Sequence, residues 1–209
     1  MKRLHDALTE LPGRDALDQE LALHLNAHEP FAVALLDVDG FQEINDRLGF
    51  AEGDKALKRL AEIVVGTNTG TTYRVSGDEF AVVMPQVTLE QAFLAAEKLR
   101  TLVAGSDFAL SDGRSLKITA GIAHSPRDAK EAQALLNAAD AALLSAKENG
   151  GNQVALPPNE EMVLKSCYYP SAGLKKLKVL AERLGQRESY LLREALTDFL
   201  RKHEALRPA

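Results

Sequence analysis

The sequence predicts a mixed α/β domain, of the α+β kind, followed by a small strand-helix-helix unit. Strand-length and helix-length apolar patterns alternate through residues 1–156, which is typical of one sheet flanked by helices. At Pro157-Pro158-Asn159 the charge changes sign: 15 Lys and Arg against 23 Asp and Glu precede it and 10 against 7 follow, so −8 becomes +3. We therefore expect a first domain over 1–156, a linker over 157–161 and a second domain over 162–209.

The elements of the first domain follow from periodicity and from turn residues. A continuous apolar run over 31–36 suits a strand that is covered on both faces. Strand-forming segments on either side of Ser76-Gly77-Asp78 indicate a hairpin, and Gly49 suits the C-cap between two helices. Helices are expected over 14–27, 41–48, 51–65, 89–103 and 131–147, and strands over 31–36, 71–75, 79–84, 116–123 and 153–156.

The second unit has a simpler pattern. An extended segment over 162–169 is stopped by Pro170, and a helix over 174–184 ends at Gly185. Ser189 suits the N-cap of a second helix. The apolar face of that helix carries Leu192, Ala195, Leu196, Phe199 and Leu200. One strand and two helices in roughly 50 residues cannot bury a core alone, so a partner chain is the expected completion.

Composition excludes several classes of protein. Hydrophobic residues make up 45% of the chain and charged residues 26%, which excludes a mostly disordered polypeptide. The single cysteine, Cys167, cannot form an intramolecular disulfide, and no apolar run approaches the ~18 residues of a membrane span. We therefore expect a cytoplasmic protein that does not bind a membrane. The net charge of −5 carries no overall signature of nucleic-acid binding.

Acidic residues gather at two predicted turns. Asp37 and Asp39 follow the buried strand two residues apart, so both side chains lean to one side of the sheet and Val38 to the other. Asp78 and Glu79 lie at the hairpin tip, so three or four carboxylates converge if the hairpin pairs beside that strand. A divalent cation would relieve their repulsion, and backbone amides over 38–41 would hold phosphate oxygens. The alternative is structural: Asp39 caps a helix and Asp78 makes a turn.

These residues carry a family resemblance. Leu36-Asp37-Val38-Asp39-Gly40-Phe41, Ile44-Asn45-Asp46, Gly53-Asp54 and Arg74-Val75-Ser76-Gly77-Asp78-Glu79-Phe80 resemble the GGDEF domain of diguanylate cyclases. An entry motif over 6–14 and a final helix with Ala146-Lys147 fit the same pattern in the same order. The resemblance implies a fold like that of adenylyl cyclase catalytic domains. It also implies that two GTP molecules are joined with Mg²⁺ (or Mn²⁺) into cyclic di-GMP.

The resemblance also implies a role for each matching residue. The expected metal ligands are Asp37, Val38 through its carbonyl, and Asp78. The expected catalytic residues are Asp78, Glu79 and Lys147. The expected nucleotide-binding residues are Phe41, Asn45, Asp54, Ser76, Gly77 and Lys147, with Asn45 and Asp54 reading the guanine edge. For Asn45 and Lys147 the alternative is a solvated position on a helix.

Some positions depart from the family pattern. Ser76 replaces the first glycine of the motif, Gln42 a usual lysine, Gly151 a usual arginine and Phe50 a usual histidine. The Arg-x-x-Asp pair of the product-inhibition site is missing upstream of the hairpin, so feedback through that site is not expected. The residues expected to bind the metal and to read guanine are therefore all present, whereas the positive charges that the family places near the phosphates at positions 42 and 151 are missing. The alternative function is therefore a weak or inactive domain that senses GTP or cyclic di-GMP and regulates transcription.

The basic tail resembles a ribbon-helix-helix DNA-binding module over 164–196. In that family two chains pair their strands into one ribbon that enters the major groove, which implies a homodimer bound to DNA. The residues expected to contact DNA are Leu164, Lys165, Ser166, Tyr168 and, at a phosphate, Ser189. The alternative is a dimerisation module that does not bind DNA.

Overall fold

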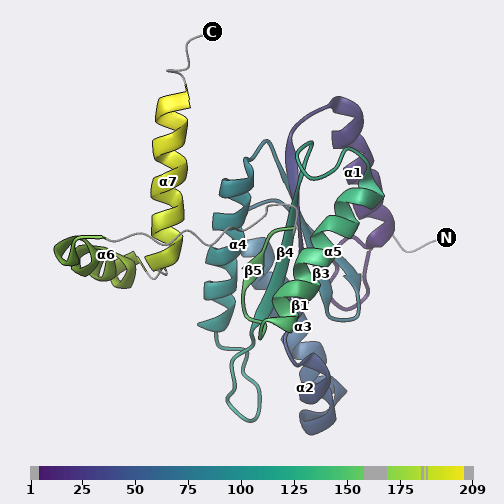
Figure 1. Ribbon diagram of the computed structural model, residues 1–209. Coiled ribbons are helices and arrows are strands. Elements are labelled where there is room, and N and C mark those ends of the chain that lie inside the picture. The colour runs from purple at the N-terminus through teal and green to yellow at the C-terminus, as the bar shows by residue number, and fades with distance from the viewer. Residues whose placement is uncertain (1–4, 158–168, 185, 187, 205–209) are drawn as a thin grey trace. The chain divides into compact units, whose positions relative to one another are not determined.

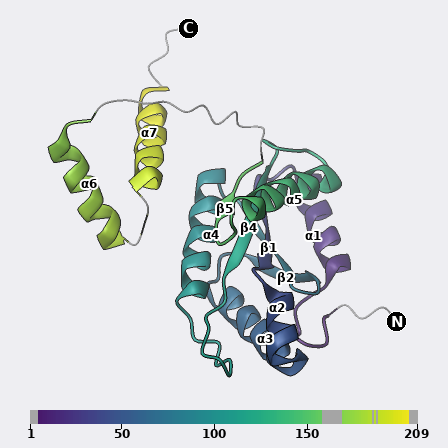
Figure 2. The ribbon, with the colours of Figure 1, turned by 60° about the horizontal axis from the view of Figure 1, so that its bottom comes forward.

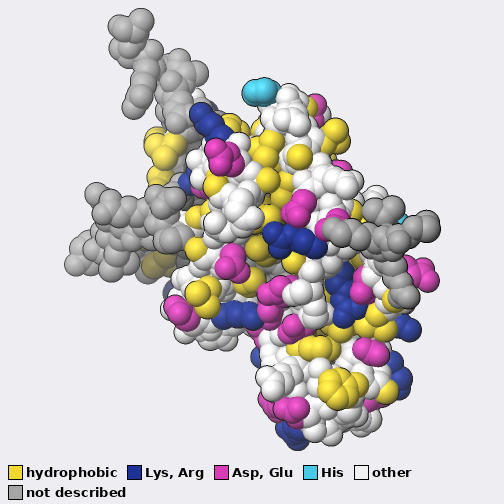
Figure 3. Space-filling view, turned by 90° about the vertical axis from the view of Figure 1, so that its right-hand side faces the viewer, with side chains coloured by type: hydrophobic (Ala, Val, Ile, Leu, Met, Phe, Trp, Pro, Cys, Tyr) yellow, Lys and Arg dark blue, Asp and Glu magenta, His cyan; other side chains and the backbone are white. Residues whose placement is uncertain are grey.

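The structure is a computed structural model that describes residues 5–157, 169–184, 186 and 188–204 (Figure 1). Its internal contacts divide the chain into two units, Met1–Met162 and Val163–Ala209. Acidic and basic side chains are interspersed over the face that Figure 3 presents. No helix in the described ranges has the length and apolar character needed to cross a membrane.

The first unit is a mixed sheet with helices on both faces, as expected. Within the described residues, five strands form one sheet in the order β2-β3-β1-β4-β5, antiparallel except for the β4–β5 pair. The strands are β1 (Phe31–Val38), β2 (Thr71–Ser76), β3 (Glu79–Pro85), β4 (Ile118–Ser125) and β5 (Val154–Ala155). The helices are α1 (Arg14–Ala27), α2 (Phe41–Leu48), α3 (Phe50–Gly66), α4 (Leu89–Ala104) and α5 (Ala132–Glu148).

The central strand β1 separates two hydrophobic cores. Because side chains alternate along a strand, Ala32, Ala34 and Leu36 pack into the core that includes α3 and α4. Phe31 and Val33 pack into the opposite core, with residues of α1 and α5. Figure 2 shows the sheet between these two pairs of helices. The same alternation directs the side chain of Asp37, at the end of β1, toward the α5 face.

Strand bounds differ from the expected ones because backbone pairing does not end where the apolar pattern ends. β1 continues through Val38 because it pairs with β4 up to Val38↔Ile118. β4 runs to Ser125 rather than to residue 123, since the polar His124 and Ser125 still pair with β1. The last strand, β5, is two residues long instead of four. Ladder hydrogen bonds, rather than side-chain polarity, set these ends.

The second unit contains α6 (Ser171–Leu184) and α7 (Glu188–Glu204). The helix α6 begins earlier than expected, because the Pro170 carbonyl accepts the Gly173 and Leu174 amides at 2.9 and 3.2 Å and opens the first turn. Ser189 lies inside α7 rather than before it, so its expected N-cap position is wrong. The expected extended segment lies outside the described residues apart from Tyr169, as do Leu164, Lys165, Ser166 and Tyr168.

Few apolar side chains of the second unit are buried within one chain. Ala181 and Leu191 are the buried residues among those described there, and Leu191 is not on the expected face of α7. The apolar faces of α6 and α7 remain largely exposed, and we define them as Leu174, Leu180, Leu184, Leu196, Phe199 and Leu200.

Candidate active site

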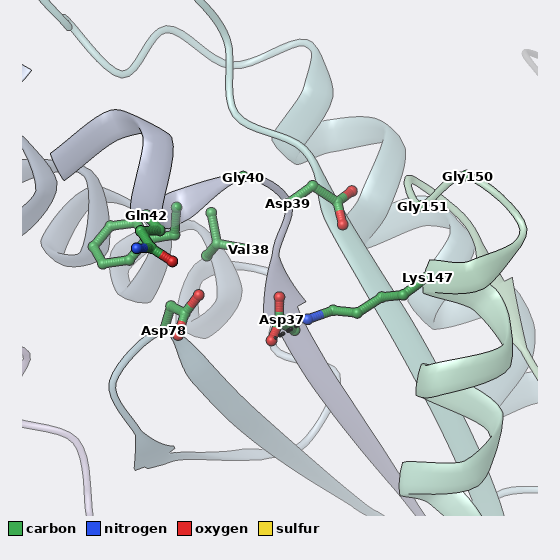
Figure 4. Close-up of a pocket in the computed structure, with 10 residues that line it drawn as sticks. Asp37, Val38, Asp39, Gly40, Gln42, Asp78, Lys147, Gly150 and Gly151 are labelled. Atoms are coloured by element: carbon green, nitrogen blue, oxygen red, sulfur yellow. Dashed lines mark ion pairs between the residues drawn. The ribbon is translucent and has the colours of Figure 1, made fainter. Parts of the chain in front are cut away.

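A pocket opens where β1 ends and the chain turns into α2. Its cavity volume is about 490 Å³. Figure 4 shows side chains from β1, α2, the β2–β3 turn and the end of α5 directed toward this space. The lining residues are Asp37, Val38, Asp39, Gly40, Phe41, Gln42, Asp78, Lys147, Gly150 and Gly151. The expected metal ligands and Lys147 are thus brought together.

The register of the strands explains why these residues lie close together. Asp37 stands opposite Glu79 on β3 and opposite Thr119 on β4. The turn of the β2–β3 hairpin therefore reaches the same edge of the sheet as the end of β1, and it brings Asp78 with it. Gly40 adopts a left-handed conformation, with φ of 69°, and starts α2 immediately beyond the strand.

Asp37 is the buried carboxylate of the pocket, with 6% of its surface exposed. Its Oδ2 lies 2.6 Å from Nζ of Lys147, in the last turn of α5. Burial raises the pKa of the Asp37 carboxyl above its ordinary value; Lys147 opposes this rise, and the charges of Asp78 and Glu79 add to it. Lys147 therefore only partly compensates the cost of placing a negative charge here.

The other two carboxylates of the expected cluster, Asp39 and Glu79, accept hydrogen bonds from within the protein. Figure 4 shows the Asp39 carboxylate directed away from Asp78, toward the turn at Gly151. It accepts hydrogen bonds from Thr119 Oγ1 at 2.6 Å and from the Asn152 amide at 2.8 Å. Glu79 Oε2 accepts a hydrogen bond from Ser76 Oγ at 2.6 Å. Three of the four expected carboxylates, Asp37, Asp39 and Asp78, therefore line the pocket, but the oxygens of Asp39 are already hydrogen-bonded to the protein.

The donor set nevertheless suits a divalent cation. Two carboxylates and a backbone carbonyl are hard oxygen ligands of the kind Mg²⁺ takes, with water and phosphate oxygens completing the shell. Within the described part of the chain, no three His, Cys, Asp or Glu side chains could hold a metal ion together. A cation here would therefore depend on Asp37, Val38 and Asp78 together with oxygens from a bound nucleotide.

The two residues expected to read guanine lie on α2 and α3, outside the lining of this pocket. Asn45 is partly buried on α2, and Asp54 is exposed on α3. Between them lies Gly53, where an added Cβ would collide with Asn45 Oδ1 and lie 3.1 Å from Cζ of Phe41. Gly53 therefore lets the Asn45 amide lie directly against α3, beside Asp54. Phe41 lies close to Gly53 and also lines the pocket.

The hairpin turn is anchored from its far side. Arg74 donates from Nε and Nη2 to the Gly77 carbonyl, at 3.1 and 2.6 Å, and from Nη1 to Asp6 Oδ1 at 2.6 Å. Ser76 and Gly77 line a second pocket of about 300 Å³ beside Arg74. Ser76 and Gly77, which were expected to bind nucleotide, line this second pocket, whereas the next residue, Asp78, lines the pocket of Asp37 and Lys147.

Comparison with known proteins identifies the fold. Residues 3–153 match the family described as diguanylate cyclase, GGDEF domain. The chain belongs to the GGDEF family. The GGDEF domain of PA1120 (YfiN or TpbB) from Pseudomonas aeruginosa superimposes with a TM-score of 0.67 at 34% identity, covering 71% of this chain and 98% of that one. The GGDEF domain of DgcB from Caulobacter crescentus, in complex with c-di-GMP, gives a TM-score of 0.65 at 26% identity, covering 74% and 93%.

Curated relatives of this GGDEF chain are longer proteins. Diguanylate cyclase TpbB from Pseudomonas aeruginosa is 36% identical over 171 residues, which is 77% of this chain and 39% of the relative. Diguanylate cyclase A from Treponema denticola is 33% identical over 135 residues, which is 63% of this chain and 36% of the relative. The matched region thus spans less than two fifths of the length of either relative.

Some contacts in this GGDEF domain could not be found from sequence. Thr119 is 80 residues from Asp39, its hydrogen-bond partner, and no local pattern marks it. The importance of Gly53 depends on the packing of α2 against α3, which the motif spacing does not reveal. Asn152 is 113 residues from Asp39, and its hydrogen bond to that carboxylate has no local signal either.

The raised pKa of Asp37 predicts a stability effect. The ionised carboxylate costs stability at pH values above its folded pKa, and this cost disappears as the pH falls toward the unfolded value of 3.8. Asp37→Asn is therefore expected to raise the melting temperature by up to a few degrees at pH 7 in metal-free buffer, with the gain shrinking toward pH 4. Thermal unfolding followed by circular dichroism measures this. Asp18→Asn, at an exposed pair with Arg14, is the matched control. A lower melting temperature at pH 7 would show that the Lys147 ion pair outweighs burial.

Proposed function

We propose that the GGDEF domain condenses two GTP molecules into cyclic di-GMP. The observation that carries this proposal is the pocket in which Asp37, Asp78 and Lys147 meet at the end of β1. Each new bond joins a ribose hydroxyl oxygen to an α-phosphorus and releases one pyrophosphate. Two nucleotides must face each other, so two GGDEF domains are needed.

In this proposal, Asp37, Val38 and Asp78 would hold Mg²⁺ or Mn²⁺ together with oxygens of the nucleotide. The bound cation would polarise the phosphate oxygens and favour ionisation of the attacking hydroxyl. Lys147, 39% exposed and within reach of the pocket, supplies positive charge to the phosphates, and Glu79 lies opposite Asp37 near the attacking group. The first amides of α2, beyond Gly40, would donate hydrogen bonds to a phosphate bound at this helix N-terminus.

The assay uses the full chain with GTP and Mg²⁺ or Mn²⁺, and chromatography follows cyclic di-GMP and pyrophosphate in a 1:2 ratio. ATP in place of GTP, and GTP with excess chelator, are expected to give no cyclic dinucleotide. Absence of product from folded protein with either metal would refute the enzymatic proposal.

The guanine is proposed to contact Asn45 and Asp54. Gly53→Ala is expected to weaken GTP binding roughly 10- to 100-fold, because a Cβ displaces Asn45 and one or two hydrogen bonds are lost. Alanine favours a helix over glycine, so overall stability is not expected to fall in parallel. Isothermal titration with a non-hydrolysable GTP analogue measures the affinity. Gly66→Ala, in open space at the end of the same helix, is the matched control. Equal affinities for the two variants would place guanine elsewhere.

A second candidate function is nucleotide sensing without turnover. Two observations favour it: the Lys147 ion pair already neutralises part of Asp37, and the neutral Gln42 lines the pocket. Calorimetry that detects GTP or cyclic di-GMP binding, in protein that forms no product, would select this function.

The second unit is proposed to form a homodimer through the apolar faces of α6 and α7, in the manner of a ribbon-helix-helix module. A unit of this size cannot be stable with Ala181 and Leu191 alone buried among its described residues, and a second copy supplies matching apolar faces. Leu180→Asp is expected to shift the chain from dimer to monomer in sedimentation experiments. Leu144→Asp, at an exposed leucine of the first unit, is the control. A variant that remains dimeric would exclude this surface.

DNA binding by the same dimer is proposed from the resemblance of the tail and from its basic charge. Lys175, Lys176 and Lys178 are exposed on α6. Selection from a random duplex library, followed by a gel shift with and without GTP and cyclic di-GMP, tests binding and its coupling to nucleotide. No enrichment over random duplexes would exclude sequence-specific binding.

A further inference from the structure

Asp39 lines the pocket, but both of its carboxylate oxygens are already used by the protein. Oδ1 accepts from Thr119 Oγ1 at 2.6 Å, and Oδ2 accepts from the Asn152 amide at 2.8 Å. The same amide lies 2.8 Å from Thr119 Oγ1, so three groups from three parts of the chain close one hydrogen-bonded cluster. We call this cluster the Asp39 clasp. Thr119 is fully buried, so its hydroxyl is a fixed partner rather than a solvated one.

The clasp holds an unusual turn. Gly150, Gly151 and Asn152 have φ values of 103°, 65° and 48°, so three successive residues are left-handed. A Cβ at Gly151 would lie 3.0 Å from Asp39 Oδ1, so the backbone sits close against the carboxylate. Asn152 Oδ1 also accepts from Arg100 Nη1 at 3.1 Å, which ties the turn to α4. Asparagine tolerates this left-handed conformation better than most residues other than glycine, and the hydrogen bonds of Asn152 to Asp39, Thr119 and Arg100 hold it in place.

This turn closes the end of α5. The Gly150 amide donates to the Lys147 carbonyl at 3.0 Å, and the Gly151 amide donates to the Ala146 carbonyl at 3.1 Å. Lys147 therefore lies in the helical turn that the clasp completes. Asp37 and Asp39 are two residues apart at the end of β1, so the clasp joins the strand that carries Asp37 to the helix end that carries Lys147.

We infer that Asp39 is a positioning residue that acts through Lys147. This inference rests on the proposed function, because it assigns Lys147 to the phosphates of GTP. Asp39 fixes the distance between the end of β1 and the end of α5, so that the Lys147 ammonium stays at the pocket when it exchanges Asp37 for a phosphate. Its carboxylate serves as a double hydrogen-bond acceptor and is not a cation ligand.

The test compares Asp39→Ala with Asp39→Asn in the full chain. Alanine removes both acceptors. Asparagine keeps an oxygen for the Asn152 amide, and its NH₂ group donates to Thr119 Oγ1, although the Thr119 hydroxyl then loses its acceptor; both hydrogen bonds of the Asn152 amide are therefore retained without the charge. Asp140→Asn, exposed on α5, is the matched control. Thermal unfolding verifies that each variant is folded.

Amide hydrogen exchange by NMR, without nucleotide, tests the clasp independently of activity. The Asn152, Gly150 and Gly151 amides are expected to exchange at least about 10-fold faster in Asp39→Ala, and at nearly the wild-type rate in Asp39→Asn. Unchanged exchange in Asp39→Ala would overturn the clasp even if the wild type makes cyclic di-GMP. Conversely, if the wild-type protein forms no cyclic di-GMP, the proposed enzymatic function is refuted. The hydrogen-exchange measurement still decides whether the clasp exists.

Kinetics then test the link to Lys147. Asp39→Ala is expected to lower kcat/KM about 10- to 100-fold, with Asp39→Asn restoring most of it. In a Lys147→Met background, Asp39→Ala is expected to cause little further loss, because the group it positions is absent. Additive losses would show that Asp39 acts independently of Lys147. A loss in Asp39→Asn as large as in Asp39→Ala would show that the charge itself is required, as at a cation ligand.

Discussion

Gly121→Ala is expected to destabilise the GGDEF domain by about 3 kcal/mol or more, because overpacking here cannot be relieved by a side chain. Gly121 is buried in β4, and an added Cβ would collide with the Ala139 carbonyl and the Leu143 amide and lie 2.9 Å from Leu143 Cα. All three atoms belong to the backbone of α5, so the whole helix must move away from the sheet.

The measurement is thermal or urea unfolding of the full chain. A loss of this size corresponds to a melting temperature lower by roughly 6–12 °C in a domain of this length. Gly105→Ala is the matched control, since its Cβ would make ordinary contacts of 3.5 and 3.9 Å. Equal melting temperatures for the two variants would show that α5 adjusts easily on the sheet. Any displacement of α5 also carries Lys147 away from Asp37.

Asp78→Asn is expected to lower kcat for cyclic di-GMP formation on the order of a thousandfold, equivalent to several kcal/mol of charge stabilisation. Asp78 lines the pocket with Asp37, and the proposed cation would retain one carboxylate ligand instead of two. The fold is expected to persist, because the Asp78 charge raises the pKa of Asp37 and its removal relieves repulsion in the metal-free protein.

Steady-state kinetics with saturating Mg²⁺ and GTP test this prediction, with Asp18→Asn as the charge-matched control. The loss is expected in kcat more than in KM, since the interaction strengthens as negative charge develops during reaction. Activity within a few-fold of the wild type would remove Asp78 from the proposed ligand set.

The sequence predicted the structure well where a local repeat, such as the two-residue alternation of a strand, determines it. Two-residue alternation along the buried strand placed Asp37 and Asp39 on one side of the sheet, and both side chains do face groups on the α5 side. Helix bounds were within a few residues because glycines such as Gly49 and Gly66 stand at their ends. Motif order was sufficient to predict the family.

Sequence reasoning failed where the partner lies far along the chain. Asp39 was expected among the cation-facing carboxylates or at a helix cap, whereas its partners Thr119 and Asn152 are 80 and 113 residues away. Such contacts depend on strand register, which no local pattern specifies.

Dilution is the condition under which the apolar faces of α6 and α7 matter most. Leu184, Leu196 and Phe199 leave 54%, 59% and 61% of their surfaces exposed within one chain. If a second copy covers them, dissociation follows mass action, and the melting temperature of the second unit rises with protein concentration. Each GGDEF domain is then tethered near another, so the rate per chain stays constant until dilution separates the tails and falls steeply below that point.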